Sequence, residues 1–336
     1  MALRVAINGF GRIGRLVLRS IIEHGRTDIE VVAINDLGPV ETNAHLLRFD
    51  SVHGRFPAEV KVEDGKMVIN GKPITVTAIR DPKELPHAEL KVDIALECTG
   101  IFTAKEKAAA HLEAGAKRVL VSAPATGADK TIVYGVNHET ITASDLIVSN
   151  ASCTTNCLSP VAKVLHDLVG IEKGMMTTIH SFTNDQPSLD QMHKDLYRSR
   201  AASLSMIPTS TGAAKAVGLV LPELQGKLDG ISVRVPTPNV SVVDLKFIAG
   251  RNTTPEEINA AIIKAADSGP LKGVLGYTDQ PNVSADFIHD NRSSIFHLDQ
   301  TKVMDGNFVS IMTWYDNEWG FATRMSDTAL HMAKFL

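Results

Sequence analysis

A glycine-rich segment near the N-terminus places the strongest constraint on the fold. Residues Gly9–Gly14 have the pattern G-x-G-x-x-G. The segment Leu3–Asn8, which precedes it, is apolar like a buried strand, and Arg12–His24, which follows, has apolar residues at helical spacing. A second apolar segment, Ile29–Asn35, completes a β-α-β unit of about thirty residues, the size of a parallel crossover.

The context of these glycines predicts a dinucleotide site. Gly9 would permit a tight turn, Gly11 the close approach of a pyrophosphate, and Gly14 the close packing of helix on strand. Unpaired N–H groups at the helix N-terminus would bind the anion. Asp36 ends the second strand, where a carboxylate accepts from a ribose 2′-hydroxyl and repels a 2′-phosphate. We therefore predict NAD as the cofactor and reject a glycine turn followed by an incidental N-cap aspartate.

The remaining pattern predicts two domains. Strands and helices alternate over residues 1–151, which is typical of a Rossmann doubly wound parallel sheet. Its further strands are expected at Val92–Glu97, Arg118–Ser122, Ile132–Val136 and Leu146–Ser149, with a helix at Ala104–Ala114 and a hairpin insertion at Glu59–Ile79.

Residues 152–316 predict an α+β catalytic domain with a mainly antiparallel sheet, because long strands follow one another there. Its elements are expected at Thr154–Val169 (helix), Met175–Phe182, Gly230–Val235, Val240–Ile248 and Phe308–Tyr315, with a further helix opened by Thr254. We expect the C-terminal helix, about 317–336, to pack back on the first domain.

Composition excludes several classes of protein. A net charge of -4 gives no general electrostatic reason to bind nucleic acid or an anionic membrane. Three cysteines in so long a chain argue against a secreted disulfide framework. The first residues run directly into a strand without the features of a signal peptide, and no apolar run would span a bilayer. We expect a cytoplasmic protein with no nucleic-acid or membrane partner.

Two of the cysteines, Cys153 and Cys157, lie four residues apart where a strand ends and a helix begins. A helix N-terminus favours a thiolate, and lowering the pKa of Cys153 by about two units would make that form dominant at pH 7. The spacing C-x3-C, with only His166 nearby, is poor for zinc, so we predict no metal. Cys157 lies one turn behind Cys153 and is expected to be a small buried residue.

Candidate partners for this thiol lie further along the chain. His180 ends an apolar strand and is the best placed of twelve histidines to act as a base. Residues suited to anion binding follow it. They are Lys194, Arg198, Arg200, Thr209–Gly212 and Arg234, the last of which interrupts an apolar strand.

These residues lie within segments that resemble the phosphorylating glyceraldehyde-3-phosphate dehydrogenases. The segments, in chain order, are INGFGRIGR, IND, SNASCTTNCLSPVAKVL, TTIHS, HKDL, PTSTGAAKAV, VRVPTPNVSVVDL and WYDNEWG. The resemblance extends over essentially the whole chain. It implies a glycolytic or gluconeogenic enzyme that converts D-glyceraldehyde 3-phosphate, NAD and inorganic phosphate to 1,3-bisphosphoglycerate.

The resemblance also implies a role for individual residues. Cys153 would be the nucleophile and His180 its acid–base partner. Positions that match cofactor contacts of the family, beside the three glycines, are Arg12, Ile13, Asp36, Arg80, Ser122 and Asn317. Thr183 and Arg234 would hold the substrate phosphate, and the second anion site would comprise Ser152, Thr154, Arg198, Thr211 and Gly212. The family is usually a homotetramer, in which the loop from about Ser181 to Met206 lies against a neighbour's cofactor site.

Three alternatives stay open at this point. Erythrose-4-phosphate dehydrogenases share the glycine fingerprint and the cysteine motif. A Cys-His hydrolase would use Cys153 and His180 without redox chemistry, and an NAD-sensing interaction protein would not need them. Gln191-Met192 stands where NAD-specific members often have Leu-Pro, so strict preference for NAD over NADP is a separate question.

Overall fold

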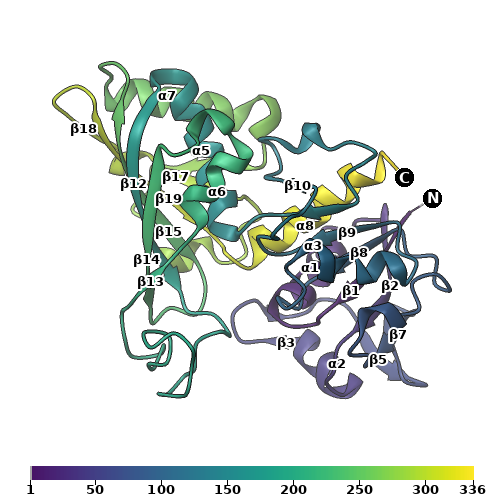
Figure 1. Cartoon of the computed structure of the whole chain (residues 1–336). Helices are drawn as coiled ribbons and strands as arrows, with labels where there is room; N and C mark the ends of the chain where they lie inside the picture. Colours follow the sequence, from purple (N-terminus) through teal and green to yellow (C-terminus); the bar gives the residue numbers. More distant parts are fainter. Residues whose placement is uncertain (1) are drawn as a thin grey trace. The chain divides into compact units, whose positions relative to one another are not determined.

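The computed structural model describes residues 2–336 and divides into two compact units (Figure 1). Unit 1 comprises the described residues up to Ile132, together with His138–Ala151 and Ala322–Leu336. Unit 2 comprises Val133–Asn137 and Ser152–Phe321. Within residues 2–336, no helix is both long and apolar enough to cross a membrane.

Unit 1 contains a nine-stranded sheet in the order β10-β11-β9-β8-β1-β2-β7-β6-β5. The strands are β1 Leu3–Asn8, β2 Ile29–Asn35, β5 Val60–Glu63, β6 Lys66–Ile69, β7 Lys72–Thr77, β8 Ile94–Glu97, β9 Arg118–Val121, β10 Lys130–Thr131 and β11 Ile147–Ser149. Every pair from β10 to β7 is parallel, and β6 is antiparallel to both of its neighbours, β5 and β7. The predicted Rossmann sheet is confirmed, and the predicted insertion supplies its last three strands.

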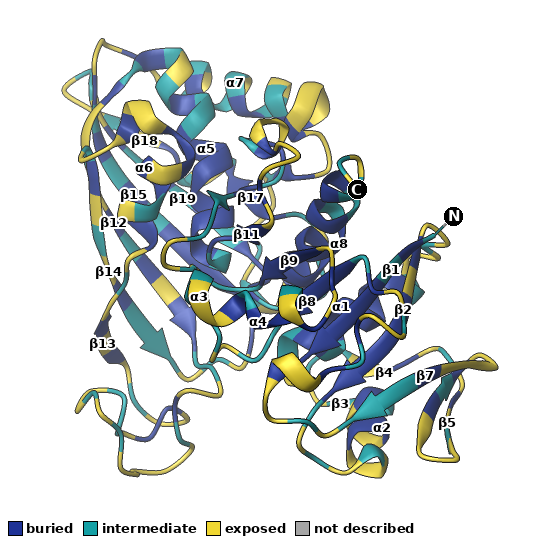
Figure 2. Ribbon diagram, turned by 45° about the vertical axis from the view of Figure 1, so that its right-hand side comes forward, coloured by how far each residue is buried: buried dark blue, intermediate teal, exposed yellow. Residues whose placement is uncertain are grey.

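The helices of unit 1 are short except for the first and the last. They are α1 Arg12–Glu23, α2 Val40–Arg48, α3 Lys105–Ala108, α4 Ala110–Glu113 and α8 Trp319–Ala333, of which unit 1 holds the part from Ala322. The central strands β1, β8 and β9 are buried along nearly their whole length (dark blue in Figure 2), and most of their residues are apolar because both faces of the strands are covered. The hydroxyl of Thr328 on α8 donates to the Oδ1 of Asn150 at 2.8 Å, which joins the C-terminal helix to the end of β11.

Two details of the predicted first domain are wrong. The strand expected at Ile132–Val136 is a turn, because Gly135 has a φ of 85° and the side chain of Asn137 accepts from the Val133 N–H. The strand pairing with β11 lies just before it, at Lys130–Thr131. The helix expected at Ala104–Ala114 is two single-turn helices separated at Ala109.

Unit 2 contains a mainly antiparallel sheet in the order β13-β14-β12-β15-β19-β17-β16, with β18 beside β19. The strands are β12 Ile171–Ser181, β13 Ile207–Ser210, β14 Leu228–Val235, β15 Ser241–Ala249, β16 Leu275–Thr278, β17 Ser294–His297, β18 Lys302–Met304 and β19 Phe308–Tyr315. Among the described strand pairs of this sheet, only β12–β14 and β16–β17 are parallel. The helices α5 Cys153–Val169, α6 Ala213–Val220 and α7 Pro255–Asp267 pack on this sheet and on one another.

The start of α7 provides a test of this local structure. Thr254 is its N-cap, and the Thr254 hydroxyl accepts from the backbone N–H of Glu257 at 3.2 Å. We expect Thr254→Ala to lower the free energy of unfolding of unit 2 by about 1 kcal/mol, because one N–H of the first turn loses its acceptor. Both tryptophans, Trp314 and Trp319, belong to unit 2, so their fluorescence during urea unfolding measures the effect. Thr254→Ser keeps the acceptor and should match the parent, and equal loss in both variants would contradict the capping role.

Candidate active site

A cavity of about 500 Å³ opens where β1, β2, β7 and β8 end in unit 1. The carboxyl ends of these parallel strands meet at one edge of the sheet, and β1 lies between β2 and β8, where successive connections turn to opposite sides. The cavity is lined by Asn8, Gly9, Gly11, Asn35, Asp36, Leu37, Ile79, Arg80, Cys98, Thr99, Ile101 and Phe102. The predicted residues Gly9, Gly11, Asp36 and Arg80 are therefore brought together.

The three glycines differ in the space around them. Gly9 has a φ of +89°, and a Cβ added there would lie 2.7 Å from the backbone nitrogen of Thr99. A Cβ on Gly14 would lie 2.1 Å from the Gly9 carbonyl oxygen. A Cβ on Gly11 would meet nothing within 4 Å, so the backbone there faces open space. The first and third glycines thus permit the fold of the loop, and the second leaves room for a ligand such as a pyrophosphate.

The side chains beside this loop are already ordered by hydrogen bonds. Asp36 Oδ2 accepts from the Phe10 N–H at 2.9 Å, and Asp36 Oδ1 accepts from the Gly38 N–H at 2.9 Å. The guanidinium of Arg12 pairs with Asp50. Burial raises the pKa of Asp50, but the hydrogen bonds from Arg12 and from two backbone N–H groups outweigh it and lower that pKa to about 2.

The other predicted cofactor positions are more dispersed. Ile13 is half-buried at the start of α1, and Ser122 follows β9 with its N–H bonded to the Glu97 carbonyl oxygen at 2.9 Å. Neither lines the cavity. Asn317 belongs to unit 2, where its Oδ1 accepts from the hydroxyls of Ser181 and Ser241, both at 2.9 Å. Because these bonds occupy the oxygen, the amide presents its Nδ2 as a donor.

A buried polar network under the cavity was not predicted from the sequence. Glu97 Oε2 accepts from Asn8 Nδ2 at 2.7 Å and lies 2.9 Å from His111 Nε2. The other nitrogen of His111 lies 3.1 Å from His87 Nε2, and burial lowers the pKa of His87 to about 4. Asn8 Oδ1 accepts from Asn35, which joins this network to the lining of the cavity. The sequence shows Asn8, Asn35 and Glu97 as isolated polar residues at the ends of apolar strands, which is its only signal of the network.

In unit 2, the predicted thiol and imidazole lie side by side. Cys153 is the first residue of α5, and Cys153 Sγ lies 3.5 Å from His180 Nε2 near the end of β12. The N-cap Ser152 accepts from the Thr155 N–H at 3.0 Å, which holds the first turn of the helix. His180 is 4% exposed, and its ring meets that of Tyr315 edge-on with the centroids 5.9 Å apart.

The hydrogen bonds of His180 determine its tautomer. His180 Nδ1 lies 2.7 Å from the carbonyl oxygen of Ser181, which can only accept, so we assign the hydrogen to Nδ1. Arg234 Nη1 also lies 3.0 Å from Nδ1, but it donates its own hydrogens to the Ser181 carbonyl oxygen and the Thr183 hydroxyl. The lone pair of Nε2 then faces the thiol of Cys153. Burial, followed by the charge of Arg234, lowers the pKa of His180 to about 3. The imidazole is therefore neutral at pH 7 and able to accept a proton.

The helix terminus is not the only influence on the protonation of Cys153, because the structure adds burial, which opposes a thiolate. Burial raises the pKa of the Cys153 thiol above its usual value. The charge of Arg234 and hydrogen bonds from Thr154 and the first backbone N–H groups of α5 lower it, but burial outweighs them. The resting pair is a thiol beside a neutral imidazole, so the proton must transfer when the sulfur reacts.

Arg234 joins this pair to one of the predicted anion sites. Arg234 Nη1 donates to the Ser181 carbonyl oxygen at 2.8 Å and to the Thr183 hydroxyl at 3.4 Å, and it lies 3.0 Å from His180 Nδ1. The predicted residues Thr183 and Arg234 are thus in contact with each other and lie next to the imidazole. A guanidinium and a hydroxyl at this position can bind a phosphate group.

The residues of the second predicted anion site differ in how far they are already hydrogen-bonded. Arg198 donates to Asp185 at 2.6 Å and to Thr209 at 3.0 Å, and its charge still lowers the pKa of His180. Gly212 is the N-cap of α6 and makes no side-chain cap, and Thr211 accepts from the Ala213 N–H at 3.1 Å. By contrast, Arg200 pairs with Asp190 on the surface of the loop.

Tyr315 is a site residue that sequence reasoning missed. Its hydroxyl shares hydrogen bonds of 2.8 Å with the hydroxyls of both Thr154 and Thr178. The Thr154 side chain therefore points into the core, and its backbone N–H is the group left to meet an anion. Cys157 is fully buried behind this layer, and burial raises the pKa of its thiol to about 12.

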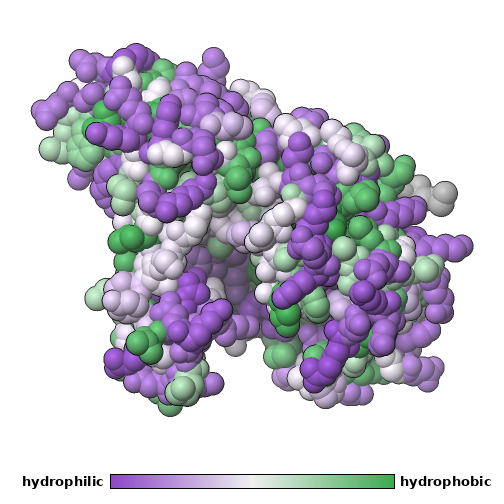
Figure 3. Space-filling model, in the orientation of Figure 1, coloured by the Kyte–Doolittle hydropathy of each residue, from purple (hydrophilic) through white to green (hydrophobic). Residues whose placement is uncertain are grey.

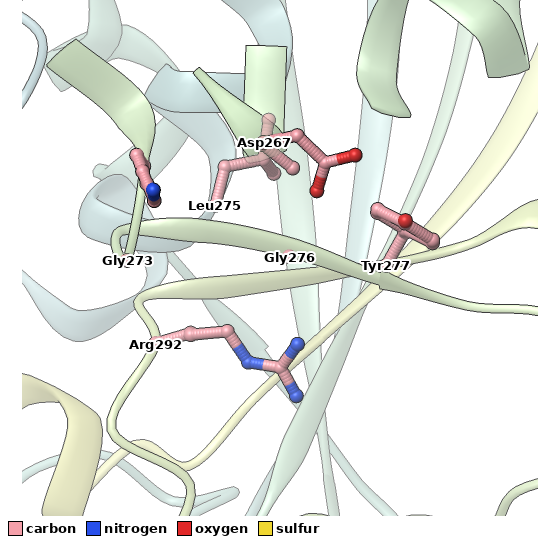
Figure 4. A pocket seen from close by; sticks show the side chains of 8 residues that line it. Asp267, Gly273, Leu275, Gly276, Tyr277 and Arg292 are labelled. Atoms are coloured by element: carbon pink, nitrogen blue, oxygen red, sulfur yellow. The ribbon is translucent and has the colours of Figure 1, made fainter. Parts of the chain in front are cut away.

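Another hollow in unit 2, of about 690 Å³, lies between α7, β16 and the segment that carries Arg292 (Figure 4). Its lining includes Asp267, Tyr277 and Arg292 but no cysteine or histidine. Arg292 is already bound twice to the carboxylate of Asp290, at 2.9 and 2.5 Å. This hollow is larger than the cavity beside the glycines, yet it contains none of the predicted reactive groups.

The electrostatic role of Arg234 can be tested at the thiol. Since its positive charge stabilises the thiolate, Arg234→Met should raise the apparent pKa of Cys153 and slow its alkylation by iodoacetamide on the order of tenfold at pH 8. Peptide mass spectrometry across pH measures the rate at each cysteine. Arg200→Met is the matched control and should leave the profile unchanged, and Cys98 and Cys157, whose pKa values burial raises to about 12, should stay unmodified. An unchanged profile in Arg234→Met would contradict this coupling.

Comparison with known proteins agrees with this geometry. Residues 3–105 match the family profile "Glyceraldehyde 3-phosphate dehydrogenase, NAD binding domain", and residues 152–317 match "Glyceraldehyde 3-phosphate dehydrogenase, C-terminal domain". The chain is 75% identical over 334 residues, 99% of both chains, to the glyceraldehyde-3-phosphate dehydrogenase of Xanthobacter flavus. It is 75% identical over the full length of the protein of that name from Cereibacter sphaeroides, and 56% identical over 334 residues, again 99% of both chains, to that of Geobacillus stearothermophilus. The chain therefore belongs to the glyceraldehyde 3-phosphate dehydrogenase family.

Proposed function

We propose that the chain catalyses the NAD-dependent oxidative phosphorylation of D-glyceraldehyde 3-phosphate to 1,3-bisphosphoglycerate, a step of glycolysis and gluconeogenesis. The observation that carries the proposal is the 3.5 Å contact between Cys153 Sγ and the lone pair of His180 Nε2, with Arg234 beside the same ring. A nucleophile, a base and an anion binder meet there, in a chain that also has a dinucleotide cavity.

The first step is the attack of Cys153 on the aldehyde carbon. His180 Nε2 accepts the thiol proton as the carbon–sulfur bond forms, and the resulting imidazolium donates a hydrogen bond to the oxyanion. The backbone N–H of Cys153, at the start of α5, is the second donor to that oxygen. Protonation of the oxygen by His180 gives a neutral thiohemiacetal.

The second step oxidises this adduct to a thioester. His180 Nε2 takes back the hydroxyl proton as a hydride leaves the carbon. NAD, when bound, supplies the acceptor for that hydride. Since the Oδ1 of Asn317 is occupied by two hydroxyls, its Nδ2 is the donor available to hold the nicotinamide carboxamide.

The third step conserves the energy of the thioester as an acyl phosphate. A phosphate oxygen attacks the thioester carbon, and the sulfur of Cys153 leaves as a thiolate that recovers its proton from His180. Arg234 and Thr183 hold the phosphate of the substrate. The attacking phosphate is held by Ser152, the backbone N–H of Thr154, Arg198, Thr211 and Gly212.

Cofactor binding is assigned to the loop and strand ends of unit 1. The N–H groups of α1, with Gly9, Gly11, Arg12, Ile13 and Gly14, face the pyrophosphate. Asp36 accepts from the ribose 2′-hydroxyl and repels a 2′-phosphate, which favours NAD. Arg80 and Ser122 complete the set. Met192, of the pair Gln191-Met192, is 95% exposed.

Replacing the nucleophile tests the reaction. Cys153→Ser should lower the rate of NADH formation from glyceraldehyde 3-phosphate by at least about a thousandfold, because an alcohol beside a neutral imidazole is a far weaker nucleophile than a thiol. Cys157→Ser is the matched control, since its thiol is buried and is not used in any step. Turnover of Cys153→Ser close to that of the parent would refute the mechanism.

Omitting the second substrate tests the last step. Without phosphate or arsenate, the parent should release a stoichiometric burst of NADH and then slow sharply, because the thioester accumulates. Steady turnover that does not respond to phosphate would favour a Cys-His hydrolase or a simple aldehyde oxidation.

The alternatives differ in outcomes that the same assay measures. An erythrose-4-phosphate dehydrogenase would have the higher kcat/KM for the four-carbon aldehyde. An NAD-sensing interaction protein would bind NAD and show no turnover with either aldehyde. Comparison of NAD with NADP in the same assay measures the selectivity assigned to Asp36.

We assign the protein to the cytoplasm as a homotetramer without nucleic-acid or membrane partners. Its three cysteines are free thiols, as expected in a reducing compartment. The segment between β12 and β13 exposes a run of large apolar side chains: Leu189, Met192, Leu196, Tyr197, Leu204 and Met206. In the part of Figure 3 where this segment lies, hydrophobic residues (green) are exposed among hydrophilic ones (purple). Such a patch favours a protein interface.

Light scattering tests the assembly. We expect the double variant Leu189→Asp, Met192→Asp to lower the molar mass from tetramer to smaller species, because two charges would be buried at the interface. Met304→Asp, at another exposed apolar position, on β18, is the control. A monomeric parent, or a tetrameric double variant, would contradict the assigned interface.

A further inference from the structure

Three metal-ligating side chains meet in unit 1 outside the site described above. His138 and Glu139 belong to the short helix η2, His138–Thr140, and His331 lies in the last turn of α8. One donor atom of each lies within 4.8 Å of the other two. The chain segments that carry them are far apart in the sequence, so only the packing of α8 brings the three together.

The distances between the donor atoms match a small coordination site. His138 Nε2 lies 3.3 Å from Glu139 Oε1, and His331 Nε2 lies 4.0 Å from Glu139 Oε2. Donors at about 2.0–2.1 Å from a tetrahedral zinc ion are roughly 3.3–3.4 Å from one another. The two imidazole rings stand edge-to-face with their centroids 4.9 Å apart, so they do not stack in a way that would block an ion between them.

The state of His331 points independently to a ligand. The side chain is 4% exposed, and its Nε2 is buried without a hydrogen-bond partner. A buried polar nitrogen of this kind is rare in folded proteins because it loses water without gaining a partner. The Nε2 lies 4.0 Å from Oε2 of Glu139, too far for a hydrogen bond, and the exposed Glu139 side chain need move by only about 0.6 Å to reach the spacing of two ligands of one zinc ion.

We propose that His138, Glu139 and His331 bind one divalent transition-metal ion, of which Zn²⁺ is the best match. Two imidazoles and one carboxylate suit zinc, copper or nickel, whereas calcium and magnesium require a set of oxygen ligands. Glu139 is 75% exposed on its side chain, so the fourth position opens to solvent. The bound ion would tie the end of α8 to η2 and stabilise the C-terminal helix, without taking part in the chemistry at Cys153.

Lys334 regulates this site. Lys334 Nζ lies 3.3 Å from His331 Nδ1, and its side chain is exposed and can move into solvent. In this arrangement Nδ1 accepts a hydrogen bond, which leaves the proton on Nε2. Metal binding requires that the proton move to Nδ1 and that the ammonium group withdraw. The charge of Lys334 therefore opposes the ion, and its removal should strengthen binding.

The test is a Zn²⁺ titration of the full-length protein by calorimetry, in a Cys153→Ser background that removes the reactive thiol as a competing zinc ligand. We expect one Zn²⁺ per chain. His331→Ala and Glu139→Gln should each weaken binding about tenfold or more, since even outer-shell partners of a metal contribute that much. Lys334→Met should tighten binding, and the surface control His45→Ala should match the background.

Two further measurements exclude an effect of misfolding or of a general surface site. Co²⁺ added to the background protein should give the intense visible bands of a tetrahedral ion with nitrogen and oxygen ligands, and Glu139→Gln should lose them. Glu139 is exposed, so this variant keeps its fold, which circular dichroism checks. The proposal is overturned if Zn²⁺ affinity is the same in the background, His331→Ala and Glu139→Gln, or if Lys334→Met weakens binding.

Discussion

The pairing of β12 with β14 determines the arrangement of the reactive groups. These two strands are parallel, and His180 lies in register with Arg234. Residues in register on neighbouring strands project their side chains to the same face of a sheet. The imidazole and the guanidinium thus meet at the carboxyl ends of both strands, and the first turn of α5 brings Cys153 to the same point. A shift of the register by one residue would turn His180 to the opposite face and separate all three.

The low dielectric around this cluster explains its protonation. A helix N-terminus stabilises negative charge, yet burial destabilises any isolated charge by more. Arg234 already provides one partly buried positive charge, which disfavours an imidazolium beside it. The resting site therefore holds a neutral thiol and a neutral imidazole. The thiol transfers its proton to the imidazole, and charges form, only when the sulfur attacks a substrate. The proposed mechanism depends on that reversibility.

In unit 1, hydrogen bonds from neighbouring strands hold the glycine-rich loop in position. Gly9 and Gly11 contribute no side chains to the loop, so its position depends on the buried Phe10 and on neighbouring contacts. Asp36 holds the Phe10 N–H, and the Asn8–Glu97–His111 network joins the ends of β1 and β8. Such a network favours a single arrangement of its side chains, because a buried polar group without a hydrogen-bond partner costs free energy. The cavity is therefore lined both by the strand ends and by the loop that they support.

Local patterns in the sequence predicted the β-α-β unit, the roles of Gly9, Gly11 and Gly14, the Rossmann sheet and the cap at Thr254. Each depends on residues close together in the chain, whose sterics and hydrogen bonds act locally. The sequence also indicated Cys153 and His180, through their places at the ends of elements. Tertiary structure alone decided the protonation of that pair, the partnership of Tyr315 with Thr154, the network around Glu97, and the meeting of His331 with His138. These depend on burial and on contacts between segments remote in the chain, and neither quantity is a property of a local pattern.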